Sequence, residues 1–424
     1  MNVLEQSAAR LAGEFTAVRG GADANLDAFA RAVLGLVAEP GDGVLGRAIA
    51  AIGAVRTADA LVERRSADQL VSLVCEAGEV FDEREASTGL ERWLPRLDQS
   101  AFVRTLTQAA RVGARFIVPG DAGWPTAVDE LGVHAPIGLW VRGHLGALPS
   151  STPSIALVGA RAATGYGEHV AMESSAGLVD RGFTIISGGA YGIDGMAHRA
   201  ALSSDGPTVA FLAGGVDRFY PLGHESLLSR IAETGAVVSE LPCGAAPTKW
   251  RFLQRNRLIA AASDATVVLE AGLRSGSLNT AGHAAELGRP LGAVPGPVTS
   301  PASAGCHRLL REFDAVYVVD ADQMVELASG ILPSRAGRGN AARAAGVGTG
   351  RAPAQSGTSA SPLDPAPEML RVIDALSTRS PRVIADVARR AGMSVPEVMA
   401  VLGPLELNGI AVRHAEGWLR RRSR

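Results

Sequence analysis

Seven short apolar runs between residues 155 and 319 constrain the fold of this 424-residue chain more than any other feature. The runs are continuously apolar rather than alternating, which is typical of parallel strands buried on both faces. The spacing between successive runs leaves room for a crossover helix each time. The sequence therefore predicts an α/β fold with a doubly wound, mostly parallel, Rossmann-like sheet. The predicted strands are Ile155–Val158, Thr184–Ile186, Thr208–Leu212, Ala236–Val238, Ala265–Leu269, Leu291–Val294 and Ala315–Val319.

The first 328 residues are predicted to form two domains. Residues 1–115 place apolar side chains at helical spacing and contain few strand-like runs, which predicts a small helical domain. The Rossmann-like core is expected to span residues 116–328. Its first part, which includes Leu139–Gly143, is predicted to be a short connecting region.

The C-terminal part of the chain has two further patterns. Residues 329–365 contain almost no large apolar side chains and are predicted to form a flexible Gly/Ala/Pro/Ser linker. Residues 366–424 show three helical patterns and then a possible hairpin, the order of a winged helix. The third helical pattern contains Glu397 and Glu406 but no Lys or Arg, which favours protein contact over base reading.

Composition limits the class of protein. The formal net charge is −2, so a nucleic-acid site would have to be a local basic patch. The three cysteines lie far apart, which suits a reducing cytoplasm and offers neither a zinc site nor a disulfide framework. No signal peptide and no apolar run of about 18 residues is present, so a soluble cytoplasmic protein without a membrane span is expected.

One nine-residue run, Lys249–Arg257, concentrates four cations and two aromatic rings. Lys249 is the only lysine of the chain, and no Asp or Glu occurs from Leu241 to Ser263. Cations interleaved with rings suit single-stranded nucleic acid, whereas the alternative is a solvated basic helix face over two buried rings. Because the run follows the fourth predicted strand, its position favours a role facing phosphates.

Glycine or small polar residues follow almost every predicted strand. In an open α/β sheet, ligands bind beyond the carboxyl ends of the strands, where glycines let backbone N–H groups approach an anion. Arg161 lies in the first such loop, directly after a strand, and is well placed to bind a phosphate, with a surface ion pair as the alternative. Together, these loops form a rim at the carboxyl edge of the sheet, and this rim predicts phosphate binding. Its segments are Gly159–Arg161, Ser187–Asp194, Gly214–Asp217, Ser239–Pro242, Glu270–Ser277 and Pro295–Pro297.

Enzymatic interpretations of these loops have less support. The first loop lacks the G-x-G-x-x-G spacing, and no P-loop motif occurs. Ser187, Asp194 and His198 invite a catalytic triad, but Ser187 is not in a G-x-S-x-G elbow, and a role of Asp194 in capping the helix that holds His198 is favoured. Ser275 is a candidate helix cap or phosphate ligand.

Two glutamates that are predicted to end neighbouring strands also have two interpretations. Glu240 and Glu270 could polarise a sugar hydroxyl, or they could be structural partners of the arginines in residues 251–257. The structural role is favoured.

Taken in order, the motifs resemble the DprA/Smf family (DNA processing protein A). The resemblance covers residues 155–310 almost without a break, and the WP and APIGLWVRG motifs upstream also look like the family. The matching motifs are VGAR (158–161), SGGAYGIDGMAH (187–198), GGVDRFYP (214–221), SELP (239–242), RFLQRNRLIA (251–260), SGSLNTA (275–281), AELGR (285–289), VPGPV (294–298) and SAGCHRLL (303–310).

The resemblance implies no catalytic activity, and we expect no cofactor and no metal. The N-terminal helices of residues 1–115 are similar to the family's accessory domain of the SAM or helix-hairpin-helix type. The Rossmann-like core would bind single-stranded DNA and dimerise, protect incoming DNA from nucleases, and help to load the recombinase RecA in natural transformation. The candidate DNA-binding residues comprise a basic pocket, a backbone floor and neighbouring rim positions. They are Arg161, Phe252, Arg255, Asn256 and Arg257 for the pocket, Ser187, Gly188 and Gly189 for the floor, and Lys249, Ser275 and Gly276 at the rim.

The chain also departs from the family pattern. The GSR-type loop is GAR here, Asn279 replaces an apolar residue, and Glu39–Gly43 lacks the apolar residue of a helix-hairpin-helix between its glycines. Two other functions therefore remain as alternatives. One is a nucleotide phosphoribohydrolase in which Glu240 or Glu270 acts on an N-glycosidic bond, and the other is a protein-interaction adaptor that uses the winged helix.

Overall fold

A single nine-stranded sheet forms the centre of the protein. The computed structural model describes residues 2–150, 152–330 and 366–421. The strand order is β1-β2-β6-β5-β4-β3-β7-β8-β9, and the seven strands from β6 to β9 in this order are parallel. The seven are β3 (Ser154–Gly159), β4 (Thr184–Ser187), β5 (Thr208–Phe211), β6 (Ala236–Ser239), β7 (Ala265–Glu270), β8 (Leu291–Ala293) and β9 (Val316–Tyr317). The predicted mostly parallel α/β sheet is confirmed.

The connecting region predicted before this sheet is instead part of it. Residues Arg115–Ile117 form β1 and Leu139–Gly143 form β2, and β2 pairs antiparallel with β6. A short run of this kind becomes a strand only because the edge of β6 offers unpaired backbone groups. That partner lies about a hundred residues further along the chain, so local sequence could not reveal the pairing.

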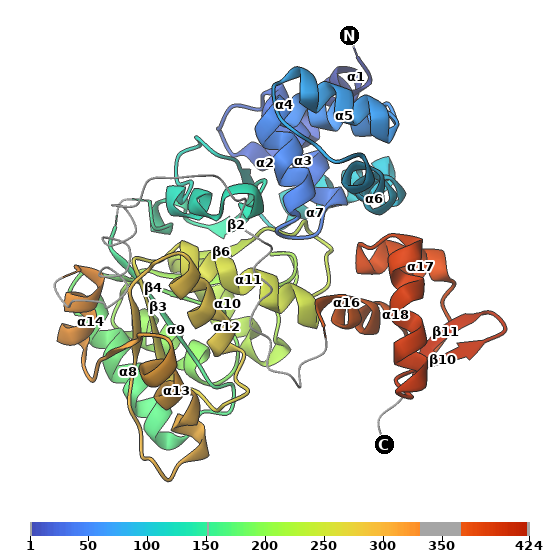
Figure 1. Cartoon of the computed structure of the whole chain (residues 1–424). Coiled ribbons are helices and arrows are strands. Elements are labelled where there is room, and N and C mark those ends of the chain that lie inside the picture. The colour runs from blue at the N-terminus through green and yellow to red at the C-terminus, as the bar shows by residue number, and fades with distance from the viewer. Residues whose placement is uncertain (1, 151, 331–365, 422–424) are drawn as a thin grey trace, which may run out of the picture.

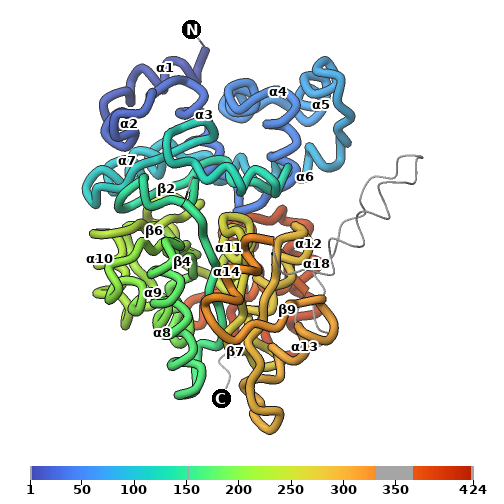
Figure 2. The backbone as a smooth tube through the Cα atoms, turned by 90° about the vertical axis from the view of Figure 1, so that its left-hand side faces the viewer, coloured from blue at the N-terminus to red at the C-terminus, as the bar shows by residue number. Residues whose placement is uncertain are grey.

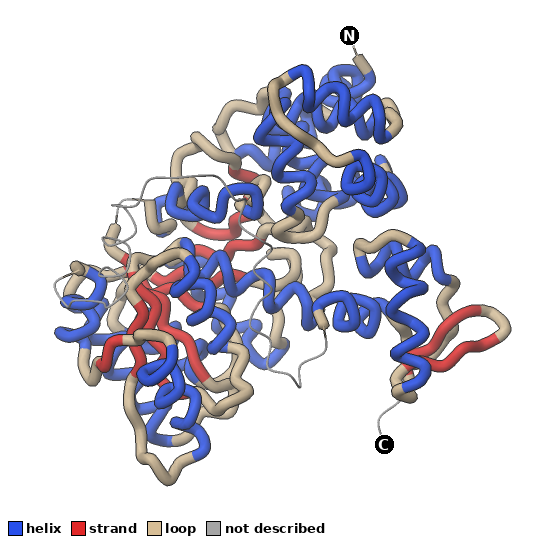
Figure 3. The backbone as a smooth tube through the Cα atoms, in the orientation of Figure 1, coloured by secondary structure: helices blue, strands red, loops and turns tan. Residues whose placement is uncertain are grey.

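Helices cover both faces of the sheet, as Figure 3 shows. Alternate strand residues point to opposite faces. Ile155 and Leu157 pack with α8 (Gly165–Asp180), α9 (Ile193–Ser203) and α14 (Ala321–Ala328). Ala156 and Val158 pack on the other side, against α11 (Lys249–Ala261), α12 (Ser277–Glu286) and α13 (Ala304–Glu312). Helix α10 (Glu225–Thr234) follows β5 and packs on β5 and β6.

The N-terminal part is a bundle of helices, as the sequence predicts. The helices are α1 (Val3–Arg10), α2 (Ala12–Arg19), α3 (Leu26–Val37), α4 (Gly43–Val62), α5 (Ala67–Glu76), α6 (Glu83–Trp93) and α7 (Gln99–Arg111). Asn25, Asp42 and Asp98 each accept a hydrogen bond from a backbone N–H in the first turn of a helix, which satisfies groups that the helix leaves free. Figure 2 shows this bundle lying over the β2 end of the sheet.

The C-terminal part is a winged helix, which confirms the predicted fold. It consists of α16 (Pro367–Ala375), α17 (Ile384–Ala391), α18 (Val395–Leu407) and the antiparallel hairpin β10 (Ala411–His414) and β11 (Gly417–Arg420). It has its own apolar core, and α16 contacts α11 of the central part, as Figure 1 shows. Of the predicted linker 329–365, residues 331–365 lie outside the described residues. No helix of the described residues is long and apolar enough to cross a membrane.

Candidate nucleic-acid interface

Loops from four neighbouring strands meet at the carboxyl edge of the sheet. Strands β6, β5, β4 and β3 are consecutive in the sheet, so their following loops lie side by side. The loops after β3 and β4 are joined directly, because the N–H of Ile193 donates to the carbonyl of Ala160 at 3.1 Å. Helix α11, which carries the basic run, begins soon after β6. This arrangement brings segments about 90 residues apart in the sequence into one surface.

The exposed part of this surface combines one cation with two aromatic rings. The side chain of Arg161 is exposed, and its guanidinium carbon lies 4.9 Å from the ring centroid of Phe252. Phe252 also contacts Tyr220, with ring centroids 5.7 Å apart and an angle of 55° between the ring planes. Tyr220 is 48% exposed. A cation stacked on an aromatic ring beside a second exposed ring can contact both phosphates and bases.

Arg255, predicted to line the pocket, is buried instead. Its Nη1 donates to the carbonyls of Gly188 at 2.7 Å and Phe211 at 2.6 Å, so the guanidinium ties the loop after β4 to the end of β5. Burial lowers its pKa to about 10 although the nearby Asp194 carboxylate favours the charged form. The guanidinium therefore supports the glycine loop from below.

Asp194 supports the same loop through its backbone N–H groups. Its carboxylate accepts hydrogen bonds from the N–H groups of Gly188 at 3.1 Å and Ala190 at 3.4 Å, while Gly192 occupies the N-cap position of α9. Burial raises the pKa of this carboxyl against the opposing effect of Arg255. The predicted capping role is corrected accordingly, since Asp194 lies within the first turn and its carboxylate binds the preceding loop.

Arg257 and Asn256 are also buried rather than at the surface. Arg257 donates from Nη2 to both carboxylate oxygens of Glu240, at 2.9 and 2.8 Å. Asn256 donates to the carbonyl of Gly276 at 3.3 Å and to Oδ1 of Asn279 at 3.2 Å. The predicted structural role of Glu240 is thereby confirmed. We predicted that the side chains of Arg257 and Asn256 line the DNA-binding pocket. Both are buried instead.

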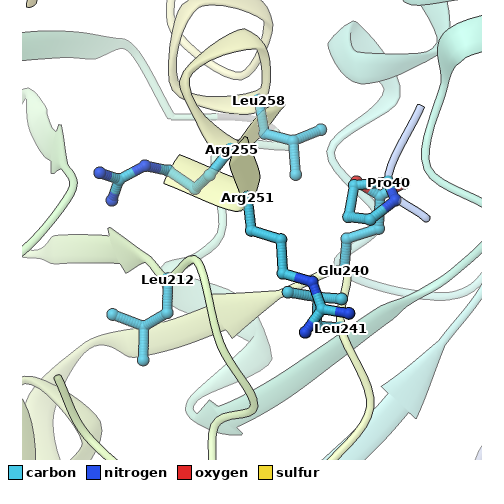
Figure 4. Close-up of a pocket in the computed structure, with 7 residues that line it drawn as sticks. All are labelled: Pro40, Leu212, Glu240, Leu241, Arg251, Arg255 and Leu258. Atoms are coloured by element: carbon cyan, nitrogen blue, oxygen red, sulfur yellow. The ribbon is translucent and has the colours of Figure 1, made fainter. Parts of the chain in front are cut away.

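After Lys249, the beginning of the basic run contacts other parts of the protein. Lys249 is exposed at the start of α11. Arg251 donates to Glu39 of the N-terminal bundle at 3.0 and 2.7 Å, and the N–H of Trp250 donates to Asp374 of the winged helix at 3.1 Å. Figure 4 shows the side chains of Arg251 and Arg255 leaving α11 in different directions around a small pocket that Glu240 also lines. The cations of α11 thus lie in three environments: Lys249 in solvent, Arg251 against the N-terminal bundle, and Arg255 in the interior.

The three residues considered as a triad do not form one. The hydroxyl of Ser187 donates to the carbonyl of Leu157 at 2.7 Å, and the ring of His198 contacts the hydroxyl of Thr208 at 2.7 Å through Nδ1. Burial lowers the pKa of His198 to about 3. Ser187, Gly188 and Gly189 are all buried, with their backbone beneath the surface described above.

The remaining candidates have local partners. Ser275 and Ser277 share a hydroxyl–hydroxyl hydrogen bond of 2.7 Å at the start of α12, and Gly276 between them is exposed. Glu270 accepts from the N–H and the hydroxyl of Thr164, at 2.8 and 2.6 Å, rather than from an arginine of α11. Its strand β7 is separated from β6 by three other strands, so the two glutamates do not end neighbouring strands.

Exposed tyrosines of these loops were missing from the predicted site. Tyr191 follows β4 and is 47% exposed, and Tyr220 follows β5. A signal was present in the sequence, because the chain has only four tyrosines and three of them follow predicted strands. Within the described residues, no group of three or more His, Cys, Asp or Glu side chains is placed to hold a metal ion.

Comparison with known proteins identifies the family. The family model for DNA recombination-mediator protein A matches residues 115–329, and the model for the DprA winged helix domain matches residues 356–417. The chain is 41% identical over 391 residues to the putative DNA processing protein DprA of Mycobacterium tuberculosis, which covers 90% of this chain and 91% of that protein. This chain belongs to the DprA/Smf family.

Two further matches extend over less of the chain. Protein Smf of Escherichia coli is 38% identical over 294 residues, 68% of this chain and 72% of that protein. The X-ray structure of DprA from Streptococcus pneumoniae superposes with a TM-score of 0.54 at 28% identity, covering 66% of this chain and 92% of that chain. The surface of Arg161 and Phe252 lies within the part that the recombination-mediator family model matches.

Proposed function

We propose that this DprA/Smf protein binds single-stranded DNA and acts as a recombination mediator that protects DNA and helps to load RecA. The observation that carries the proposal is the exposed guanidinium of Arg161 over the Phe252 ring, at the edge where four loops meet. A cation on an aromatic face suits a flexible polyanion with accessible bases. We propose no catalytic activity, since both candidate carboxylates, Glu240 and Glu270, accept hydrogen bonds from structural partners.

Binding of a labelled oligonucleotide tests the proposal. Fluorescence anisotropy with oligo(dT) and with a duplex of the same length should show tighter binding to the single strand and a steep decrease with salt, because phosphate neutralisation releases counterions. Arg161→Ala should weaken binding about tenfold or more and reduce the magnitude of the salt slope by about 0.7 for each lost phosphate contact.

The matched control is Arg104→Ala. Arg104 lies on α7 of the N-terminal bundle with a side chain that is 68% exposed, so the same charge is removed from outside the four loops. The control should bind like the wild type. Wild-type affinity in Arg161→Ala would contradict the site, and failure of the wild-type protein to bind any single strand would contradict the function.

The finer parts of the proposal need separate measurements. Loading of RecA predicts a shorter lag in RecA ATP hydrolysis on DNA coated with a single-strand-binding protein. We further propose a cytoplasmic homodimer, which sedimentation equilibrium would detect as twice the chain mass of 43.7 kDa. A monomer mass at all concentrations would contradict that assignment without affecting the DNA-binding proposal.

A further inference from the structure

All four tyrosines of this chain are exposed, although only 4% of its residues are aromatic. Tyr166, Tyr191, Tyr220 and Tyr317 are 42%, 47%, 48% and 56% exposed. Large rings would be expected first in the core of a chain with so few of them, since each can bury a large apolar area. The first three follow β3, β4 and β5, which are neighbours in the sheet. The rings are therefore concentrated at the edge that carries Arg161.

Tyr220 is held against the stacked pair described above. Its ring contacts Phe252 at 5.7 Å between centroids, and Phe252 in turn contacts the guanidinium of Arg161 at 4.9 Å. Phe252 is anchored by its place on α11, whereas about half of the Tyr220 surface remains accessible. A ring that is supported on one side and open to solvent on another is prepared to stack on a planar group.

Tyr191 holds the neighbouring loop in place. Its hydroxyl accepts a hydrogen bond from the N–H of Gly223 at 3.2 Å, and its ring meets that of His224 edge-to-face with centroids 4.7 Å apart. Gly223 and His224 belong to the same loop as Tyr220. The loops after β4 and β5 are thus linked through an exposed ring, which limits the movement of Tyr220.

We propose that Tyr220, supported by Phe252, stacks on a base of single-stranded nucleic acid, while the neighbouring Arg161 binds its phosphates. This inference rests on the proposed function and adds a base-contacting residue to it. Stacking tolerates any base, because each base has a π-face, so the platform would give affinity without sequence preference. The ring rather than the hydroxyl is the part that acts.

The test separates bases from phosphates. Anisotropy is measured with oligo(dT) and with an abasic oligonucleotide of the same length, which keeps the phosphate charge but has no bases. Tyr220→Leu keeps apolar bulk over Phe252 and should bind oligo(dT) about tenfold more weakly, with unchanged binding to the abasic strand. Tyr220→Phe should retain wild-type binding to both. Arg161→Ala should weaken binding to both strands.

The control is Tyr317→Leu, because Tyr317 lies on β9 at the far edge of the sheet and outside these loops. It should bind both oligonucleotides like the wild type. Wild-type binding of oligo(dT) by Tyr220→Leu, or an equal loss on both oligonucleotides, would overturn the stacking role. If the wild type bound neither oligonucleotide, the proposed function itself would fail, which is a different result from either of these.

Discussion

At the scale of single residues, two arginines beside one ring have opposite environments. The guanidinium carbons of Arg161 and Arg255 lie 4.9 and 5.6 Å from the centroid of Phe252. Arg161 is exposed, whereas Arg255 is buried and donates to two backbone carbonyls. A buried guanidinium needs several acceptors and a nearby negative charge, and Asp194 supplies the charge. The residue type is the same, but only the exposed arginine is available to a ligand.

The variant Arg255→Ala should therefore destabilise the fold. It leaves the carbonyls of Gly188 and Phe211 without their donor and Asp194 without its nearby positive charge, which should cost about 3–5 kcal/mol. Thermal unfolding should show a lower midpoint, and Arg255→Lys should recover only part of the loss, because an ammonium cannot reproduce the planar fork.

The control for this comparison is Arg161→Ala, which should unfold at the wild-type temperature. A wild-type midpoint in Arg255→Ala would show that the buried hydrogen bonds contribute little. The same reasoning means that a combined substitution of Arg161, Arg255 and Arg257 cannot report on DNA binding alone, since Arg257 is bound to Glu240 in the interior.

At the scale of elements, the site depends on close contact between the loops after β3 and β4. Gly192 ends the second loop with φ +73°, and a Cβ at this position would lie 2.2 Å from the carbonyl oxygen of Ala160. Both the backbone conformation and the space require glycine. Because Ala160 precedes Arg161 in the chain, the position of the exposed guanidinium depends on this contact.

Gly192→Ala should weaken DNA binding even though no side chain of the site is removed. The added methyl group must push the two loops apart, which should lower the unfolding midpoint and move Arg161 away from Phe252. Anisotropy with oligo(dT) should show several-fold weaker binding. Gly282→Ala on α12 is the matched control, since a Cβ there meets no atom within 4 Å and should leave binding unchanged. Wild-type affinity in Gly192→Ala would show that the loops adapt.

At the scale of the whole molecule, a buried carboxylate and the side chains around it join three parts of the chain. Glu39 of the N-terminal bundle accepts from Arg96 of the same bundle at 2.6 Å and from Arg251 of α11 at 2.7 Å. Arg96 also donates to the carbonyl of Arg389 in the winged helix at 2.8 Å, and Arg371 of that domain lies over the ring of Trp250. Figure 1 shows the three parts meeting near the start of α11. The winged helix is thus held beside the basic run.

Glu39→Gln should release the winged helix from this position. Removing the carboxylate leaves Arg96, Arg251 and Arg371 close together without their shared counter-charge. Small-angle X-ray scattering at pH 7.5 should show a larger radius of gyration for the variant than for the wild type. Glu312→Gln, which removes an exposed carboxylate on α13, is the control and should scatter like the wild type. Equal radii for all three proteins would contradict the predicted release.

The same junction predicts a dependence on pH. Burial opposes ionisation of Glu39, but the charges of Arg251 and Arg96 outweigh it and hold its pKa well below the ordinary 4.5. A depressed carboxyl pKa contributes stability that is complete above the ordinary pKa and is lost as the pH falls toward the lower value. The wild type should therefore lose about 1 kcal/mol of the free energy of unfolding between pH 4.5 and 3.5, whereas Glu39→Gln should lack this component, as urea unfolding of both proteins at the two pH values would show.

Much of the fold was predictable because its signals are local. The seven parallel strands appear as continuous apolar runs, and the winged helix follows from its order of helices and hairpin. Strands β1 and β2 were not predictable, because their pairing depends on the free edge of β6. At the site, the motif residues lie together as expected. Their division into exposed and buried groups depends on contacts with distant residues such as Gly188 and Glu240.

The amino-acid sequence by itself determined the parallel sheet, the loops at its carboxyl edge and the family, because apolar periodicity and ordered motifs are properties of neighbouring residues. Only the tertiary structure decided which cations a ligand can reach. Along α11, Lys249 is exposed, Arg251 binds Glu39, and Arg255 and Arg257 turn into the interior. Burial and partnership of a long, flexible side chain depend on what the fold brings beside it, and for these arginines the partners come from other elements of the chain.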